Sequence, residues 1–280
     1  MKVAALLFSV AVLGWGQAPR PAKPAKPAPP FSQNVMQVKQ YSQAENEAIV
    51  AKFKTLRTTD VYDGLQAVGL HRVTVMDHEI GPMWTDNENF THVVYGVAVT
   101  LRLVPPQEVP PNTEFQSNGE FSKWQRTWGQ RNMGGAVGAF LAPDTVLVID
   151  APLRADNGYC GSANALGWKL RGVRGIVTNA GCRDSDEMWK ERIPVYQKDS
   201  TRWVNEGTIA VESYNLPVVV GEVLVMPGDV IVADLDGVAV VPRAKAELVA
   251  KIAREIRDGD NKGRRSLYEK GGMKPDFTLK

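Results

Sequence analysis

The stretch GSANALGWKLRGVRGIVTNAGCRDSDE, Gly161–Glu187, decides the fold because it joins a helical pattern to a strand pattern. A helix is expected from Ser162 to Gly172, since glycine commonly follows the last turn of a helix. The apolar run GIVTNAGC then predicts a strand that ends at Cys182. With a further apolar run before them, this helix and strand form the pattern of a β-α-β unit.

The end of this strand and the start of this helix are expected to meet. Helix and strand run antiparallel to each other in a β-α-β unit, so these two ends lie at one edge of the sheet. That edge is where open α/β sheets bind ligands. Gly161 and Ser162 should therefore face Arg183 and Asp184, which follow the strand.

The residues at this edge have the chemistry to bind a small acid. Free N–H groups at a helix start attract anions, and Gly161 lets an anion approach them closely. Arg183 can hold a carboxylate or an enolate with two parallel hydrogen bonds, and Asp184 is a hard oxygen ligand for Mg²⁺ or Mn²⁺. The set predicts a site where a metal polarises the carbonyl of a 2-oxo acid, so that a nearby C–C bond breaks through an enolate. The alternative is a surface salt-bridge cluster, because Arg-Asp is a common dipeptide.

Helix and strand patterns alternate along the rest of the chain, which predicts an α/β fold with a mixed sheet. Ser42 with Glu45 three residues later forms a capping-box pattern, and Thr58 or Thr59 is expected to cap a second helix that ends at Gly69. A last amphipathic helix is expected over 243–259. Strands are expected over 92–104, 144–152 and 193–199, and three more within 216–242, where Pro-Gly-Asp and Asp-Gly mark the turns.

A polar segment rich in proline and glycine separates two of these strands, at 105–135. Within it, Trp124 and Trp128 lie one helical turn apart. The pattern favours a surface helix that buries both indoles, and a mobile lid is the functional alternative.

The N-terminus differs in composition from the rest of the 280 residues. Residues 1–18 have the basic start, apolar run and small residues of a secretory signal peptide, with an uncleaved membrane anchor as the alternative. Residues 19–30 form a Pro/Ala/Lys spacer, and 31–280 are expected to fold as a single domain. The sequence thus predicts a soluble protein that is secreted or periplasmic and has no membrane span after cleavage.

The charge of the chain does not indicate a nucleic-acid binder, because the formal net charge is only +2. Basic residues gather at 264–280, where a solvated tail is expected. The two cysteines, Cys160 and Cys182, match no zinc motif. They are expected to be either a disulfide, which export permits, or two free buried thiols.

Other polar residues favour structural roles. Asp229, Asp234 and Asp236 fall in predicted hairpin turns. Asp60 and Asp63 lie in an early predicted helix, and the alternative for them is a functional role at the ligand-binding edge of the sheet. The histidines are scattered without metal-ligand spacing and favour structural or surface roles: His71, His78 and His92.

A longer series of motifs resembles one protein family, that of 4-hydroxy-4-methyl-2-oxoglutarate aldolase and the regulator of ribonuclease activity A. The resemblance runs from about Thr58 to Gly259, and its motifs follow one another in the order and spacing of the family. They are TTDVYDGL, VMDHEIGPM, GVAVT, DTVLVIDAP, GSANALGWKLRGVRGIVTNAGCRDSDE, IPVY and MPGDVIVADLDGVAVVP. Some relatives carry the label of a menaquinone methyltransferase, but the sequence has no glycine-rich nucleotide loop that would support it.

This resemblance implies a swivelling β/β/α fold, assembled as a trimer or hexamer with active sites between subunits. Its aldolase members use a divalent metal, Mg²⁺ or Mn²⁺, to cleave 4-hydroxy-4-methyl-2-oxoglutarate into two molecules of pyruvate. They also decarboxylate oxaloacetate. The implied function here is a class II aldolase or oxo-acid lyase whose partner is a small 2-oxo acid.

The family motif implies roles for individual residues. Arg183 would bind substrate, Asp184 would bind the metal, and Glu187 would hold metal-bound water or orient its neighbours. Backbone N–H groups of Ser162, Ala163 and Asn164, next to Gly161, would bind the pyruvate carboxylate.

The sequence departs from the aldolases at one position of this motif. They place an aspartate directly after the glycine, where it supports proton transfer, and this chain has Ser162. Serine supplies no charge there and is a poor general base unless activated, so it is expected to serve as the N-cap of the helix. The alternative function is therefore a non-catalytic, exported binding or regulatory protein.

Overall fold

The sheet is built around one long strand, β2 (Val94–Val104), which pairs with three others. It runs parallel to β3 (Thr145–Asp150) and antiparallel to β11 (Val230–Asp234) and β8 (Ala210–Tyr214). Most of β2 and all but the last residue of β3 are buried, as the apolar patterns at 92–104 and 144–152 predict.

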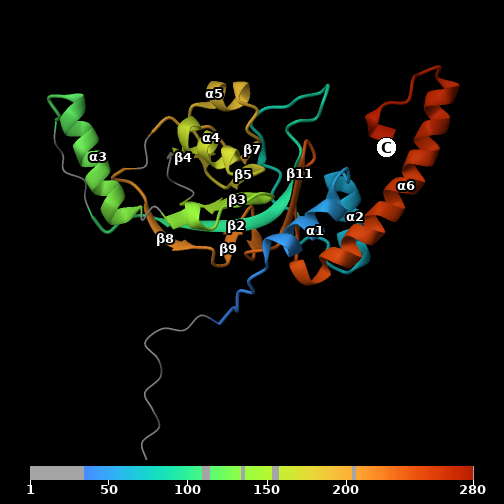
Figure 1. The fold of residues 1–280 in the computed structure, drawn as a ribbon, viewed down its shortest axis with the longest axis horizontal. Helices are drawn as coiled ribbons and strands as arrows, with labels where there is room; N and C mark the ends of the chain where they lie inside the picture. The colour runs from blue at the N-terminus through green and yellow to red at the C-terminus, as the bar shows by residue number, and fades with distance from the viewer. Residues whose placement is uncertain (1–34, 109–113, 134–135, 153–157, 204–205, 280) are drawn as a thin grey trace, which may run out of the picture. The chain divides into compact units, whose positions relative to one another are not determined.

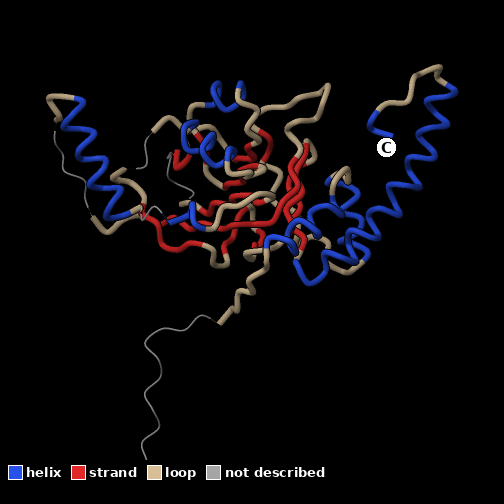
Figure 2. The backbone as a smooth tube through the Cα atoms, in the orientation of Figure 1, coloured by secondary structure: helices blue, strands red, loops and turns tan. Residues whose placement is uncertain are grey.

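The sheet is mixed, as predicted, with the order β1-β7-β5-β3-β2-β11-β12 and β8 also paired to β2. Neighbours from β2 to β7 are parallel, and the remaining pairs are antiparallel. Figures 1 and 2 show this arrangement in a computed structural model that describes residues 35–108, 114–133, 136–152, 158–203 and 206–279. The other strands of this sheet are β1 (Gly81–Pro82), β5 (Gly175–Thr178), β7 (Val195–Gln197) and β12 (Gly237–Val241).

The predicted signal peptide and the spacer lie outside the described residues. Residues 36–280 form one compact unit. None of the helices in the described ranges has both the length and the apolar character that crossing a membrane requires.

The first two helices begin where the sequence predicts, but the second is capped differently. Ser42 and Glu45 form the expected capping box at the start of α1 (Gln43–Phe53). In α2 (Thr58–Ala67) the N-cap is Arg57, so the expectation of a threonine cap is wrong. Two carboxylates take the place of a threonine cap: Asp60, in the first turn of α2 itself, accepts the N–H of Arg57 at 2.8 Å, and Asp234, at the end of β11, accepts the N–H of Thr58 at 2.8 Å.

The strand predicted at 175–182 is two strands. The strand is interrupted at Asn179, directly after β5. The next strand, β6 (Gly181–Cys182), pairs in parallel with β4 (Gly158–Cys160) in a separate ladder. The Asn179 side chain makes this break, since its Oδ1 accepts the N–H of Ala151 at 2.8 Å and its Nδ2 donates to Asp150 at 3.1 Å.

The expected first strand within 216–242 is likewise two strands, β9 (Val218–Val220) and β10 (Val223–Val225). They form a hairpin whose turn residues, Gly221 and Glu222, have φ of 55° and 64°. Positive φ at both central residues is the signature of a type I′ turn, which glutamate rarely adopts and the sequence therefore conceals.

The segment at 105–135 contains a surface helix, α3 (Asn118–Asn132), followed by a 3₁₀ turn, η1 (Ala136–Ala139). Only one of its two predicted indoles is buried. Trp128 is 5% exposed and donates from Nε1 to the carbonyl of Ile209 at 3.3 Å, whereas Trp124 is half-buried against other aromatic rings.

The C-terminal helix is longer than predicted, and the basic segment expected as a solvated tail is exposed over most of its described residues but is helical as far as Lys270. After the short turn η2 (Arg243–Lys245), α6 (Ala246–Lys270) continues past Gly259. The chain then returns, and η3 (Phe277–Leu279) buries Leu279 and stacks Phe277 edge-on against Phe90. Figure 2 shows this return of the chain beside α6.

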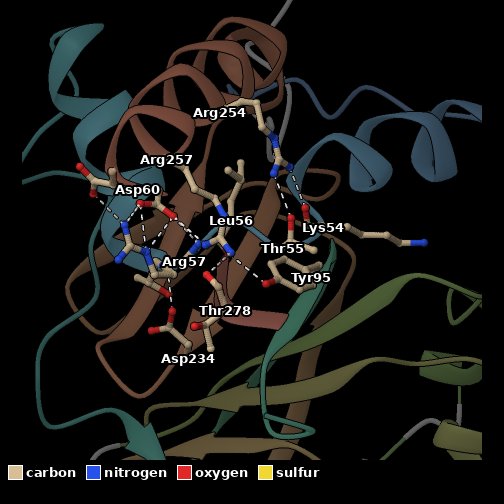
Figure 3. A network of polar contacts seen from close by, with 12 residues as sticks. Lys54, Thr55, Leu56, Arg57, Asp60, Tyr95, Asp234, Arg254, Arg257 and Thr278 are labelled. Carbon is tan, nitrogen blue, oxygen red and sulfur yellow. Dashed lines mark hydrogen bonds and ion pairs between the residues drawn. The ribbon is translucent and has the colours of Figure 1, made fainter. Parts of the chain in front are cut away.

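An ion-pair network fixes α6 to α2 (Figure 3). Asp60 is 1% exposed and pairs with Arg57, which is partly exposed, and with Arg257 of α6 at 3.4 Å. Arg257 is itself 5% exposed and donates to the carbonyl of Thr278 at 3.5 Å. The network thus places Asp60 in a structural role and joins the start of α2, the middle of α6 and the C-terminal segment.

Replacing Arg257 by methionine should destabilise the protein by about 2–4 kcal/mol, because Asp60 then keeps a buried charge with one partner fewer. Urea unfolding followed by circular dichroism measures this. The control is Arg254→Met on the same helix. Among the described residues, the partly exposed guanidinium of Arg254 bonds to Thr55 and to the backbone carbonyls of residues 52 and 54. This substitution should cost less than about 1 kcal/mol. Equal losses in the two variants would contradict the role given to the buried pair.

Candidate active site

The helix start and the strand end that the sequence predicts to meet do meet. Strands β4 and β6 align Cys160 with Cys182, so the residues that follow them, Gly161 and Arg183, are neighbours. The N–H of Arg183 donates to the carbonyl of Cys160 at 3.0 Å, which extends this pairing by one residue. Helix α4 (Ser162–Leu170) begins directly after Gly161, and α5 (Ser185–Lys190) begins after Asp184.

Asp184 is held against the start of α4. Its backbone is left-handed, with φ of 59° and ψ of 42°, a conformation that aspartate tolerates better than most residues. One carboxylate oxygen, Oδ2, accepts the N–H of Ser162 at 3.2 Å, and the other accepts Nε of Arg183 at 3.2 Å. The side chains of Arg183 and Asp184 are each 33% exposed, so solvent reaches both.

Position 161 needs a residue without a side chain. A Cβ there would lie 2.7 Å from Oδ2 of Asp184, a distance that no relaxed contact allows. The backbone of Gly161 is extended, with φ of −101° and ψ of 167°, which any residue adopts. The glycine is therefore required by the close approach of the carboxylate and not by backbone strain.

Ser162 connects the two helices. It is the first residue of α4, and Gly161 is the N-cap, so the expectation that Ser162 caps the helix is wrong. Its hydroxyl instead donates to Oε2 of Glu187, in the first turn of α5. The serine is 7% exposed, and its N–H and hydroxyl bring the carboxylates of Asp184 and Glu187 to one place.

The remaining predicted carboxylate-binding residues, Ala163 and Asn164, are exposed in the first turn of α4 and line a cavity beside it. Within the described ranges, the N–H of Ser162 is engaged by Asp184, and no side chain caps the N–H of Ala163 or Asn164. The first turn of α4 thus offers donors at the position where the sequence predicts an anion.

The donor set fits a hard divalent cation that is only partly enclosed by protein. Mg²⁺ is usually held by one or two carboxylates, with water and substrate oxygens completing the shell. Asp184 and Glu187 supply two carboxylates, and no group of three or more His, Cys, Asp or Glu side chains that could hold a metal occurs among the described residues. A cation here would therefore be bound by Asp184 and Glu187 and would leave positions open for substrate.

The two cysteines are free thiols, both fully buried beneath this site. They lie opposite each other in the β4–β6 ladder. Burial raises the pKa of the Cys160 thiol well above its ordinary value, so it is neutral and serves as packing.

The other polar candidates lie in structural positions. His92 is buried and its Nδ1 accepts the N–H of Asp86 at 3.0 Å, and burial lowers its pKa. Asp229 accepts N–H groups of Met226 and Arg243, and Asp234 holds both its own turn and the start of α2. The turn interpretation of these aspartates is confirmed, with the added contact to α2 that no local pattern could indicate. His71, His78, Asp63 and Asp236 are exposed.

Sequence reasoning missed the residues that surround the first turn of α4 on its other side. Tyr159 and Trp168 stack with ring centroids 6.4 Å apart, and Glu206 lies close by in the same cavity lining. The only sequence signal for them was their proximity to Gly161, and Glu206 has no motif of its own.

Comparison with known proteins agrees with this architecture. The sequence profile of the RraA-like family, described as Aldolase/RraA, matches residues 58–240. A candidate 4-hydroxy-4-methyl-2-oxoglutarate aldolase of Halalkalibacterium halodurans is 29% identical over 128 residues, which are 46% of this chain and 60% of that protein. An uncharacterized protein of Methanocaldococcus jannaschii is 30% identical over 123 residues, 42% of this chain and 57% of that protein. The matched regions thus span less than two thirds of these relatives.

Solved structures show the same fold at low identity. An uncharacterized protein of Pseudomonas syringae superposes with a TM-score of 0.61 at 17% identity, over 81% of this chain and 94% of that one. RraAS2 of Streptomyces coelicolor, described as an unusual member of the RNase ES inhibitor RraA family, superposes with a TM-score of 0.59 at 22% identity, over 78% and 96% of the two chains. With the family profile covering well over half of the chain, this protein belongs to the RraA-like family.

Proposed function

We propose that this protein is a divalent-metal-dependent lyase that breaks a C–C bond in a 2-oxo acid and releases pyruvate. The observation that carries the proposal is the meeting of a guanidinium, two carboxylates and a helix start at one accessible place, on Arg183, Asp184, Glu187 and Ser162. The candidate aldolase among the relatives supports the same reaction class.

In this proposal the substrate carboxylate binds between the first turn of α4 and Arg183. The N–H groups of Ala163 and Asn164 form the positive end of the helix dipole, which attracts the anion. Arg183 donates from Nε to Asp184, and its two terminal nitrogens have no partner within the described ranges. These two nitrogens are therefore available to bind the substrate carboxylate with two parallel hydrogen bonds. This places the 2-oxo group next to Asp184.

Asp184 and Glu187 would hold Mg²⁺ or Mn²⁺, and the cation when bound would polarise the 2-oxo group. In the proposed reaction the C3–C4 bond of the substrate breaks, and its electron pair stays on the pyruvate fragment as an enolate. In an aldol cleavage the C4 hydroxyl gives up its proton and becomes the carbonyl of the second product. In a decarboxylation the second product is CO₂, and in both reactions C3 of the enolate takes up a proton. Arg183 stabilises the negative charge that develops.

A second candidate is a non-catalytic exported binding or regulatory protein. The observation that favours it is Ser162, whose hydroxyl is committed to Glu187 and supplies no charge where aldolases have an aspartate. The absence of turnover on oxaloacetate and on 4-hydroxy-4-methyl-2-oxoglutarate, with either Mg²⁺ or Mn²⁺, would favour this candidate over the lyase.

Export and assembly remain proposals as well. A secreted or periplasmic location is supported by residues 1–18, and N-terminal sequencing of the mature protein after cell fractionation tests it. A trimer or hexamer is supported by the family resemblance, and light scattering coupled to size-exclusion chromatography tests that assembly.

Asp184→Asn should lower kcat/KM for pyruvate release from oxaloacetate with Mg²⁺ by about a hundredfold or more, because one of two metal-binding carboxylates becomes neutral. The coupled oxidation of NADH by lactate dehydrogenase measures pyruvate. Asp186→Asn is the matched control, since Asp186 is exposed on the same helix, and it should retain activity within twofold. Full Mg²⁺-dependent activity in Asp184→Asn would remove the metal assignment.

Gly161→Ala should lower the same activity at least tenfold while changing stability by less than about 1 kcal/mol, since only the approach of Asp184 is blocked. Activity and urea unfolding are measured together. Gly263→Ala in α6, where a Cβ meets nothing within 4 Å, should leave activity unchanged. An active Gly161→Ala protein would show that the contact between Asp184 and the helix start is not needed.

A further inference from the structure

A cavity of about 740 Å³ lies beside α4, between this helix, the end of α3 and η1; we name it the α3–α4 cavity. Its size is in the range of small-molecule sites. Its lining includes Gly129 of α3 and Met133, the residue that follows this helix.

The α3–α4 cavity begins at the proposed substrate carboxylate position. Ala163 and Asn164 line it, whereas Ser162, one residue earlier, faces Glu187 on α5. One helical turn therefore borders both the Arg183–Asp184 site and the cavity. A substrate whose carboxylate binds this turn has the cavity beside it.

Two glycines line the α3–α4 cavity, and larger side chains at these positions would occupy it. Gly129 in α3 and Gly167 in α4 line it, and a Cβ added at either position would meet nothing within 4 Å. Glycine inside a helix costs about 0.5–1 kcal/mol relative to alanine, so neither helix gains stability from it. The space is therefore not required by the packing of the protein itself.

The walls of the α3–α4 cavity suit a flat group. Tyr159 and Trp168 stack at 21° to each other and, with Met133, give it apolar and aromatic surface. The two charged lining residues, Arg171 and Glu206, have opposite signs, so the cavity does not select a charged group.

We propose that the α3–α4 cavity binds the part of the substrate beyond the 2-oxo acid unit, and that this part is a flat, uncharged group that packs against Tyr159 and Trp168. The inference rests on the proposed function for the position of the carboxylate. It specifies a substrate larger than oxaloacetate, with an aromatic or similarly flat extension.

The test is isothermal titration calorimetry of the full chain with Mg²⁺, using 4-hydroxyphenylpyruvate, phenylpyruvate and pyruvate as probes. The wild type should bind 4-hydroxyphenylpyruvate at least tenfold more tightly than pyruvate. Gly167→Leu should abolish this preference by filling the cavity and leave pyruvate binding within twofold.

The matched control is Gly263→Leu, a glycine-to-leucine change in another helix where a Cβ also meets nothing. It should leave all three affinities unchanged. Both variants should melt at or above the wild-type temperature, since leucine favours helix over glycine. The proposal is overturned if Gly167→Leu and Gly263→Leu bind 4-hydroxyphenylpyruvate equally well, or if the wild type binds none of the probes.

These outcomes separate the cavity from the chemistry. Loss of the preference in Gly167→Leu, in a protein that turns over no 2-oxo acid, would support the cavity and end the lyase proposal. Turnover that depends on Asp184, together with unchanged probe selectivity in Gly167→Leu, would support the lyase and end the proposal for the cavity.

Discussion

The pairing of two very short parallel strands, β4 and β6, is the constraint on which the candidate site depends. It aligns Cys160 with Cys182 and thereby sets Gly161 beside Arg183 and Asp184. Both thiols are fully buried, so the ladder is anchored in the core although it is only two or three residues long. A slip of one residue would turn each side chain to the other face and remove Asp184 from the start of α4.

The electrostatics of the site follow from that register. A carboxylate at the N-terminus of a helix is favourable, and Asp184 already satisfies one N–H of α4. The same residue stays one-third exposed, which leaves it open to a cation or a substrate oxygen. Ser162 adds a neutral hydroxyl, so the negative charge available to a metal here comes from Asp184 and Glu187 among the described residues brought together.

Two helices add contacts that the central sheet does not provide. Helix α6 follows the region matched by the family profile, and the buried pair of Asp60 and Arg257 fixes it to α2. Helix α3 lies within that region but forms one wall of the cavity beside α4. The β4–β6 ladder and the walls of the α3–α4 cavity are separate parts of the structure: the ladder positions the residues proposed to bind the reacting end of a substrate, and the walls enclose the proposed site for its extension.

The sequence by itself determined the mixed α/β class, the strands β2, β3 and β7, the start of α1 and the meeting of Gly161 with Asp184. These follow from local patterns: apolar periodicity, a capping box and the geometry of a β-α-β unit. Tertiary structure decided the break at Asn179, the Gly221–Glu222 turn, the contact of Asp234 with the start of α2, and the contact of Ser162 with Glu187. It also decided that Glu206 lies in the cavity lining together with Trp168. Each of these depends on groups far apart in the chain or on a backbone conformation that its residues do not favour, and a local pattern carries no record of either.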